Sequence, residues 1–227
     1  MTFSILAFDQ KTGTYGAAAA TGSLCVGGWV LRGSLEAGLV ASQGTAPSTL
    51  WRDAALGAMA QGMAAENAVK SITQADEGRA HRQLTTLDPH GGTGAFTGGE
   101  SVVWAGHLAQ TGLVCAGNML AGPQVLDGLR SAYSQSTQPM ADRLISALRG
   151  AARAGGDSRG LLSAALLVLS PDAPPLDLRI DHDARPIAAL AELLRLARSR
   201  PYADWLHEVP VASDPNRAPK SLAAPQS

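Results

Sequence analysis

The chain has 227 residues, 45% of them hydrophobic, which is enough to bury a large core within one domain. Its 18 Lys and Arg residues are matched by 19 Asp and Glu residues, so no net charge favours binding to nucleic acid or to an anionic membrane. The longest apolar run, residues 163–169, is too short to cross a bilayer, and residues 1–8 lack the basic start and apolar stretch of a signal peptide. These features predict a cytoplasmic protein.

The chain begins with a predicted β-hairpin. Residues 2–8 and 14–21 are strand-like, and an Asp and a Gly in the segment between them suit a tight turn. Frequent glycines then separate two short predicted strands, at 29–31 and 38–42.

Residues with helical spacing follow. Pro47 suits a first helical turn and Gly62 suits its end, and residues 64–74 predict a second helix. Strands are then predicted at 83–88, 93–97, 102–106 and 112–116. Later helices are predicted at 123–134, 140–154 and 187–198, and two more strands at 161–169 and 176–181.

The order of these elements predicts an α+β fold. Blocks of antiparallel strands alternate with paired helices instead of following a strict βαβ repeat, which favours a four-layer αββα sandwich of two mainly antiparallel sheets. We expect one domain over residues 1–199. Residues 200–227 are rich in Pro, Ala and Ser and predict a loosely held tail.

Thr2 is the first candidate for chemistry because of its position. Aminopeptidases remove an initiator Met when the next side chain is small, so Thr2 is expected to become the N-terminal residue with a free amine. A free α-amine has a pKa of about 7.7–8.0, so part of it is unprotonated at neutral pH and can take the proton of the Thr hydroxyl. One residue then supplies nucleophile and base. Small residues are common after Met1, but the predicted hairpin would hold this one at the end of a rigid sheet.

A second candidate nucleophile is Ser158, within residues 156–160, which match the G-x-S-x-G pattern of serine hydrolases. That pattern requires a strand before the serine and a helix after it, whereas here a predicted helix precedes it and a predicted strand follows. We therefore interpret the match as accidental. In the minority alternative, His182 and Asp177 would be the partners of Ser158.

Other polar residues lie at the ends of predicted elements, where side chains can point into a cleft. Asp157 and Arg159 lie between two elements and either line a substrate pocket or form a solvated ion pair. Asn118 follows a strand and either supplies an amide donor for an oxyanion or is an ordinary turn residue. Arg82 and His107 are further pocket candidates, although each alone is more often structural.

Metal and cofactor sites find little support in the sequence. Residues 181–183 read Asp-His-Asp, but neighbours in a strand point to opposite faces and do not converge easily on one ion. There is no G-x-x-x-x-G-K-[ST] loop, and residues 92–97 fail the dinucleotide pattern at its last position. Cys25 and Cys115 form no CxxC pair and are expected to be two buried thiols. We predict no cofactor and no metal.

Short sequence blocks along the chain form an ordered set. They are residues 2–5, 96–98, 105–107, 117–118, 154–157, 159–160, 163–166 and 177–179, with Asp181. Together they resemble an uncharacterised bacterial family with a fold like that of N-terminal-nucleophile (Ntn) hydrolases, over residues 2–196. The resemblance implies an αββα sandwich and amide hydrolysis, and it names no substrate.

The opening hairpin also resembles that of proteasomal β-subunits, which likewise start with Thr after processing. Their second strand carries an acidic residue, whereas residues 17–20 are all Ala here. The resemblance therefore does not imply a charged residue that supports Thr2. Members of the bacterial family tend to place an Asn shortly after the residue that matches Gln43, where this chain has Ala46 and Pro47.

The leading hypothesis is therefore an Ntn amidohydrolase. Thr2 would attack a small amide or a peptide-like carbonyl, while Asn118 or backbone N–H groups would hold the oxyanion. The residues expected to shape its pocket are Arg82, His107, Asp157 and Arg159.

Two alternatives keep the same fold. One is a catalytically silent protein that binds a small metabolite or supports an assembly, which the missing acidic support near Thr2 favours. The other is a cyclohydrolase-type enzyme that acts on a nucleotide-like substrate. In each case we expect a small-molecule partner, and the small residues at many sheet edges predict a homodimer or a higher homo-oligomer.

Overall fold

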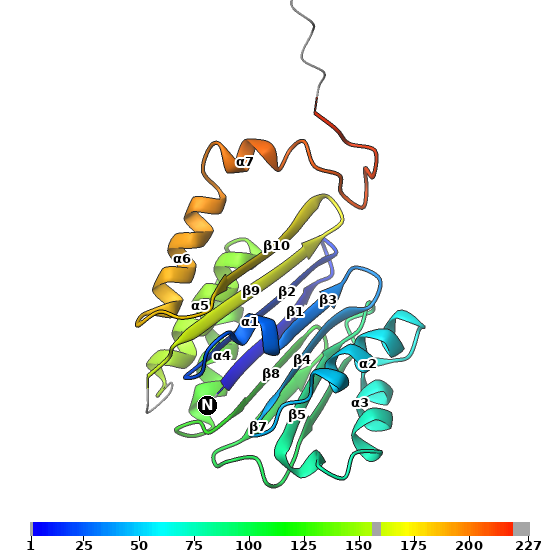
Figure 1. Cartoon of the computed structure of the whole chain (residues 1–227), viewed down its shortest axis with the longest axis vertical. Helices are drawn as coiled ribbons and strands as arrows, with labels where there is room; N and C mark the ends of the chain where they lie inside the picture. The colour runs from blue at the N-terminus through cyan, green and yellow to red at the C-terminus, as the bar shows by residue number, and fades with distance from the viewer. Residues whose placement is uncertain (1, 156–159, 220–227) are drawn as a thin grey trace, which may run out of the picture.

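The computed structural model describes residues 2–155 and 160–219 and contains two antiparallel β-sheets (Figure 1). Sheet A has six strands in the spatial order β10–β9–β2–β1–β8–β7, and sheet B has four in the order β3–β4–β5–β6. The strands of sheet A are β1 (Thr2–Asp9), β2 (Thr14–Thr21), β7 (Gly106–Gln110), β8 (Leu113–Asn118), β9 (Ser163–Ser170) and β10 (Ala173–Ile180). The strands of sheet B are β3 (Leu31–Ser34), β4 (Gly38–Gly44), β5 (Arg82–Leu87) and β6 (Thr93–Thr97).

Helices cover the outer face of each sheet. The helices on sheet A are α4 (Gln124–Gln135), α5 (Met140–Arg153) and α6 (Pro186–Ala197). The helices on sheet B are α2 (Thr49–Ala60) and α3 (Ala65–Gln74). The shorter helical segments are α1 (Val26–Trp29), η1 (Arg79–His81) and α7 (Tyr202–Trp205). The predicted four-layer αββα sandwich is confirmed, and within the described part of the chain no helix is long and apolar enough to cross a membrane.

Three apolar clusters separate the layers: one between sheet A and its helices, one between the two sheets, and one between sheet B and its helices. Along β1, Phe3 and Ile5 belong to the helix-side cluster, whereas Leu6 belongs to the cluster between the sheets. Side chains of a strand alternate between its two faces. Thr2 and Ser4 therefore lie on the face of sheet A that looks toward sheet B.

The strand expected at 29–31 is found as β3 and begins only at Leu31, because the short helix α1 occupies the residues before it. The N–H of Val30 donates to the carbonyl oxygen of Val26 at 2.9 Å, which continues the helical turn. Gly27 lets this turn approach sheet A closely, since a Cβ on it would lie 2.7 Å from the Cβ of Ala165. Close packing on β9 thus outweighs the strand preference of Val and Trp.

The prediction of a strand at 102–106 is wrong, because β7 starts only at Gly106. The N–H of Met119 donates to the carbonyl oxygen of Val102 at 2.9 Å, so the preceding loop lies against the segment that follows β8. Val103 is 83% exposed. Its β-branched side chain favoured a strand in the sequence, but the loop offers no second strand for it to join.

The two cysteines differ in exposure. Cys115 lies in β8, within the cluster between sheet A and its helices. Cys25 is exposed and precedes α1 with a φ angle of 60°. The prediction of two buried thiols is therefore wrong for Cys25, because the turn between β2 and α1 lies at the surface.

Residues 200–219 are more ordered than a loosely held tail. After α6 the chain forms α7 away from the sheets and then turns back (Figure 1). Val211 is buried, and the N–H of Ser213 donates to the carbonyl oxygen of Pro171 at 3.0 Å, in the turn between β9 and β10. This segment therefore contacts sheet A, and a domain boundary at residue 199 stays a prediction.

Candidate functional site

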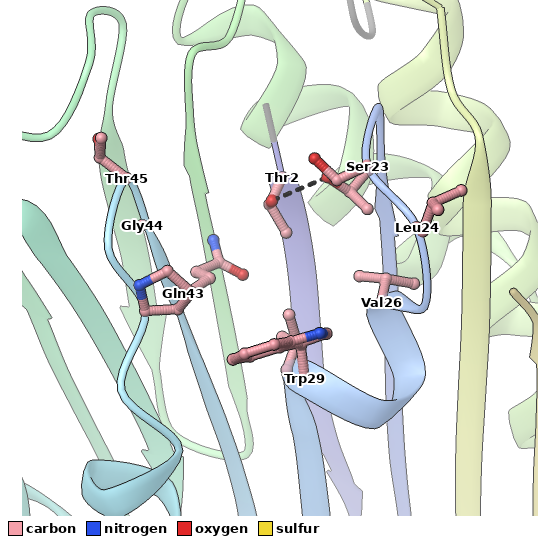
Figure 2. A pocket seen from close by; sticks show the side chains of 11 residues that line it. Thr2, Ser23, Leu24, Val26, Trp29, Gln43, Gly44 and Thr45 are labelled. Atoms are coloured by element: carbon pink, nitrogen blue, oxygen red, sulfur yellow. Dashed lines mark hydrogen bonds between the residues drawn. The ribbon is translucent and has the colours of Figure 1, made fainter.

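A pocket of about 380 Å³ opens where the two sheets meet at the start of β1 (Figure 2). Its wall consists of Thr2, Thr21, Ser23, Leu24, Val26, Trp29, Val30, Gln43, Gly44, Thr45 and Pro47. The wall thus combines the start of β1, the end of β2, the end of β4 and the helix α1, with contributions from both sheets.

Thr2 is held in the middle of sheet A. It lies opposite Thr21 in β2 and opposite Asn118 in β8, so strands flank it on both sides. Its Oγ1 lies 3.0 Å from Oγ1 of Thr21, at hydrogen-bonding distance. A hydroxyl on a central strand with a fixed partner is well positioned for a reaction that needs precise geometry.

Gln83 of β5 joins the two sheets beneath the pocket. Its Nε2 donates to the carbonyl oxygens of Gly117 at 2.8 Å and Gly106 at 3.2 Å, both in sheet A. Because these acceptors fix the position of the nitrogen, the Oε1 of Gln83 is left as an acceptor. It accepts from Nδ2 of Asn118 at 2.9 Å and from Nε2 of Gln43 at 3.2 Å.

This network fixes the orientation of the Gln43 amide. Since Nε2 of Gln43 points toward Gln83, its Oε1 is left on the side of the pocket. Figure 2 shows this oxygen on the side of Gln43 that faces Thr2. Gln43 is only 2% exposed, and its Oε1 has no donor among residues 2–155 and 160–219. The pocket wall therefore contains a buried carbonyl oxygen that has no donor in the described part of the chain.

Trp29 forms an apolar part of the wall, and α2 anchors it. Nη1 of the buried Arg52 donates to the carbonyl oxygens of Gly28 at 2.8 Å and Trp29 at 2.9 Å. The Arg52 side chain also pairs with Asp53 at 2.9 Å. The indole of Trp29 and the side chain of Leu24 nevertheless remain 53% and 55% exposed, so the mouth of the pocket is apolar.

Among residues 2–155 and 160–219, no charged side chain lines this pocket. In the described part of the chain, no three His, Cys, Asp or Glu side chains are grouped so that they could hold a metal ion. The chemistry that this wall supports therefore relies on hydroxyls, amides and backbone groups.

The structure brings only some of the predicted site residues together. Thr2 lines the pocket, and Asn118 lies beside it on β8, where its Nδ2 donates to Gln83. Asp157 and Arg159 lie outside the described residues.

Arg82 and His107 do not line this pocket. Arg82 pairs with Asp76 at 2.9 Å and lies over the ring of Trp51, 5.7 Å from its centroid. His107 lies on β7, with Nδ1 2.9 Å from Oγ1 of Thr97, and desolvation lowers the pKa of its imidazole. Both side chains therefore make contacts on the flank of sheet B, away from the pocket wall.

The minority nucleophile, Ser158, lies outside the described residues. Of its proposed partners, Asp177 forms an ion pair with Arg179, whose Nη2 donates to its carboxylate at 2.7 Å.

Sequence reasoning missed Thr21, Gln43 and Trp29 as site residues. Thr21 could have been found, because it is a polar residue at the end of an apolar strand that pairs with the strand carrying Thr2. Gln43 gave no such signal. Its place opposite Thr2 depends on how sheet B stacks on sheet A, which no local pattern contains.

Comparison with known proteins identifies the family. The model of DUF1028, a family of unknown function, matches residues 2–190. A crystal structure of protein SPO2555 from Silicibacter pomeroyi, which carries the same family model, superposes with a TM-score of 0.91 at 49% sequence identity, covering 96% of this chain and 98% of that chain. A crystal structure of eukaryotic HslV from Trypanosoma brucei gives a TM-score of 0.44 at 12% identity, covering 75% of this chain and 99% of that chain.

No curated protein matches the chain significantly. The family predicted from the sequence blocks is confirmed by the match over residues 2–190 and by the solved relative. The chain belongs to DUF1028, a family of unknown function.

Proposed function

We propose that the protein is an Ntn-type hydrolase that cleaves an amide bond in a small molecule or short peptide, with Thr2 as the nucleophile after removal of Met1. The observation that carries the proposal is the Thr2 hydroxyl, held by a central strand 3.0 Å from the Thr21 hydroxyl on the wall of a pocket. The αββα sandwich is also the fold for which the sequence resemblance implied amide hydrolysis.

The reaction proceeds in two steps. Oγ1 of Thr2 attacks the amide carbonyl carbon, and its proton passes to the α-amine of the same residue. The tetrahedral intermediate collapses with cleavage of the C–N bond, and the leaving amine takes up the proton. Water then hydrolyses the resulting ester, which releases the acid and restores the hydroxyl and amine of Thr2.

The oxyanion needs donors close to Thr2. Nδ2 of Asn118 already donates to Gln83, so its second hydrogen is the one left for this role. Gly44 and Thr45 line the same pocket, and their backbone N–H groups are further candidates. Since the described residues of the wall include no charged side chain, we expect the α-amine to act as the general base.

The first experiment is the intact mass of protein expressed without an N-terminal tag, followed by a screen of amide substrates. We expect a mass that lacks Met1, and hydrolysis that Thr2→Ala abolishes while Thr2→Ser retains part of it. A β-lactone electrophile should add one acyl group to the native protein and none to Thr2→Ala, measured by mass spectrometry. These variants keep the same pocket, because Ala and Ser fit the volume of Thr.

A matched control comes from the neighbouring hydroxyl. Thr21→Val keeps the shape of the side chain but removes the hydroxyl that lies beside Thr2. We expect it to lower the rate without preventing acylation by the lactone. Retention of Met1, or amidase activity that survives in Thr2→Ala, would contradict the proposal.

A second candidate function is binding of a small uncharged metabolite without catalysis. It is favoured by the lack of a charged side chain among the described residues of the pocket wall and by the buried alanines of β2, which stand where an acidic support would lie. For the nucleotide-like substrate of the third hypothesis, the described residues of this wall offer no cationic side chain to hold its phosphates.

A small-molecule partner, a cytosolic location and a homodimer or higher homo-oligomer belong to the same proposal. Tyr202 and Trp205 of α7 are about half exposed and their ring centroids lie 5.6 Å apart, which offers an apolar surface for self-association. Light scattering after gel filtration should give at least twice the monomer mass, and a monomer would reject this part.

A further inference from the structure

We propose that Gln43 selects the substrate: its Oε1 accepts a hydrogen bond from an N–H of the bound molecule, and the pocket takes uncharged amides that carry such an N–H next to an apolar group. This assignment rests on the proposed function of the pocket, and it adds the class of substrate. The observation behind it is the unpaired, buried carbonyl oxygen on the pocket wall.

A buried acceptor without a donor is unfavourable for the folded protein. Gln43 is 2% exposed, and no donor in residues 2–155 or 160–219 reaches its Oε1. The amide cannot simply turn over, because its Nε2 donates to Gln83, whose own orientation is set by the carbonyl oxygens of Gly106 and Gly117. A ligand N–H would satisfy the oxygen in the position that the network imposes.

The oxygen points toward the reacting group of the proposed mechanism. Figure 2 shows the amide oxygen of Gln43 on the side of that residue nearer Thr2, with the indole of Trp29 below both side chains in this view. The hydroxyl of Thr2 already has Thr21 as a partner. An amide placed with its carbonyl carbon near Thr2 can therefore direct its N–H to Gln43.

The other residues of the pocket wall determine which groups of the bound molecule can lie next to its N–H. Its apolar members are Leu24, Val26, Trp29, Val30 and Pro47. Among the described residues that line the pocket there is no Lys or Arg, so a carboxylate or phosphate would find no cationic side chain among them, and a carboxylate would also face the oxygen of Gln43. The volume of about 380 Å³ suits a small molecule with one aromatic or branched apolar group.

The test uses the Thr2→Ala protein, in which binding is measured without turnover. The probes are phenylacetamide, N-methylphenylacetamide, N,N-dimethylphenylacetamide and phenylacetate, with affinities from ligand-observed NMR. We expect the two amides with an N–H to bind about ten- to a hundredfold more tightly than the dimethyl amide, as for the loss of one buried hydrogen bond. Phenylacetate should be the weakest of the four.

Gln43→Met in the same background should remove the difference between the amides. The substitution keeps the length of the side chain, and Gln83 Oε1 keeps Asn118 as a donor, so the inter-sheet network loses only one bond. Gln43→Asn retains the amide but withdraws it from the pocket, and it serves as the second variant if Gln43→Met does not fold. Thr97→Val is the matched control, because it removes a Gln83 partner that is not on the pocket wall and should leave the discrimination intact.

The outcomes separate this inference from the proposed function. Equal affinities for the three amides, discrimination that persists in Gln43→Met, or binding of none of the probes overturns the inference. Gln43→Met is also made in the chain that keeps Thr2. If it changes only the pH profile of hydrolysis, the Gln43 oxygen acts on the α-amine of Thr2 and not on the substrate, which also overturns the inference. Discrimination through Gln43 in a protein that hydrolyses no amide would support the inference and reject the proposed function.

Discussion

Gln83 is the residue on which the arrangement of the site depends most. It is fully buried and connects five groups: the carbonyl oxygens of Gly106 and Gly117 and the amide of Asn118 in sheet A, and the amide of Gln43 and the hydroxyl of Thr97 in sheet B. Both walls of the pocket are therefore positioned by one side chain.

Replacing this side chain by an apolar one of similar length should destabilise the protein strongly. Gln83→Met removes the hydrogen bonds to two carbonyl oxygens and two buried amide groups, so we expect a loss of about 3 kcal/mol or more in the free energy of unfolding. Urea denaturation measures it. Thr97→Val, which removes a hydroxyl partner of Gln83 at the exposed flank, should cost about 1 kcal/mol or less. An equal loss in the free energy of unfolding for the two variants would contradict the central role of Gln83.

The two thiols should react very differently in the native protein. Burial raises the pKa of Cys115 to about 12, so it stays a thiol at neutral and moderately alkaline pH and is shielded from reagents. Cys25 is exposed beside two residues of the pocket wall. We expect iodoacetamide to add one group to the native chain and two to the unfolded chain, measured by intact mass.

The Cys25→Ser variant is the control for this prediction. It should take up no iodoacetamide in the native state and one equivalent after unfolding. Fast native labelling of Cys115 would show that the cluster between sheet A and its helices opens readily.

At the scale of elements, glycines determine how closely α4 and α5 pack. Gly128 and Gly150 face each other across this helix pair: a Cβ on Gly128 would lie 2.8 Å from the carbonyl oxygen of Gly150, and a Cβ on Gly150 would meet the carbonyl oxygen of Gly128. The helices therefore approach through backbone contact, which brings their apolar side chains close to sheet A.

A pair of Gly→Ala substitutions tests this packing. Gly150→Ala should destabilise the protein by about 1–3 kcal/mol, because the two helices must separate. Gly57→Ala in α2, where a Cβ would have no neighbour within 4 Å, should instead stabilise by about 0.5–1 kcal/mol through helix propensity. Thermal unfolding gives both values, and a stabilising Gly150→Ala would refute the close approach.

At the scale of the whole molecule, we expect the segment after α6 to stabilise the sandwich without being required for its folding. Deleting residues 200–227 should leave the fold intact and lower the free energy of unfolding by about 1–3 kcal/mol, because the burial of Val211 and the bond from Ser213 to Pro171 are lost. Circular dichroism and urea denaturation measure the two effects. The full-length variant Val211→Ser should reproduce part of the loss, whereas a deletion that fails to fold would reject the boundary at residue 199.

Local patterns in the sequence determined most of the elements. The alternation and turn residues of the first hairpin predicted β1 and β2 within a residue of their bounds, and β6 was predicted as it is found. Helical periodicity located α3 and α5 equally well. These signals are local, because each depends on neighbours within a few residues, and their order was enough to predict the layered sandwich. The position of Thr2 directly after Met1 also made it a candidate without any structure.

Only the tertiary structure decided how the site is built. Gln43 and Gln83 are 40 positions apart and meet only because β4 pairs with β5 in sheet B. Gln83 and Asn118 are 35 positions apart, and their hydrogen bond exists only once sheet B has stacked on sheet A. The same stacking places Arg82 and His107 away from the pocket wall, although both lie at strand ends as the sequence indicated. Contacts between distant segments depend on the register and stacking of the sheets, which are set by the packing of the whole core and not by any local pattern.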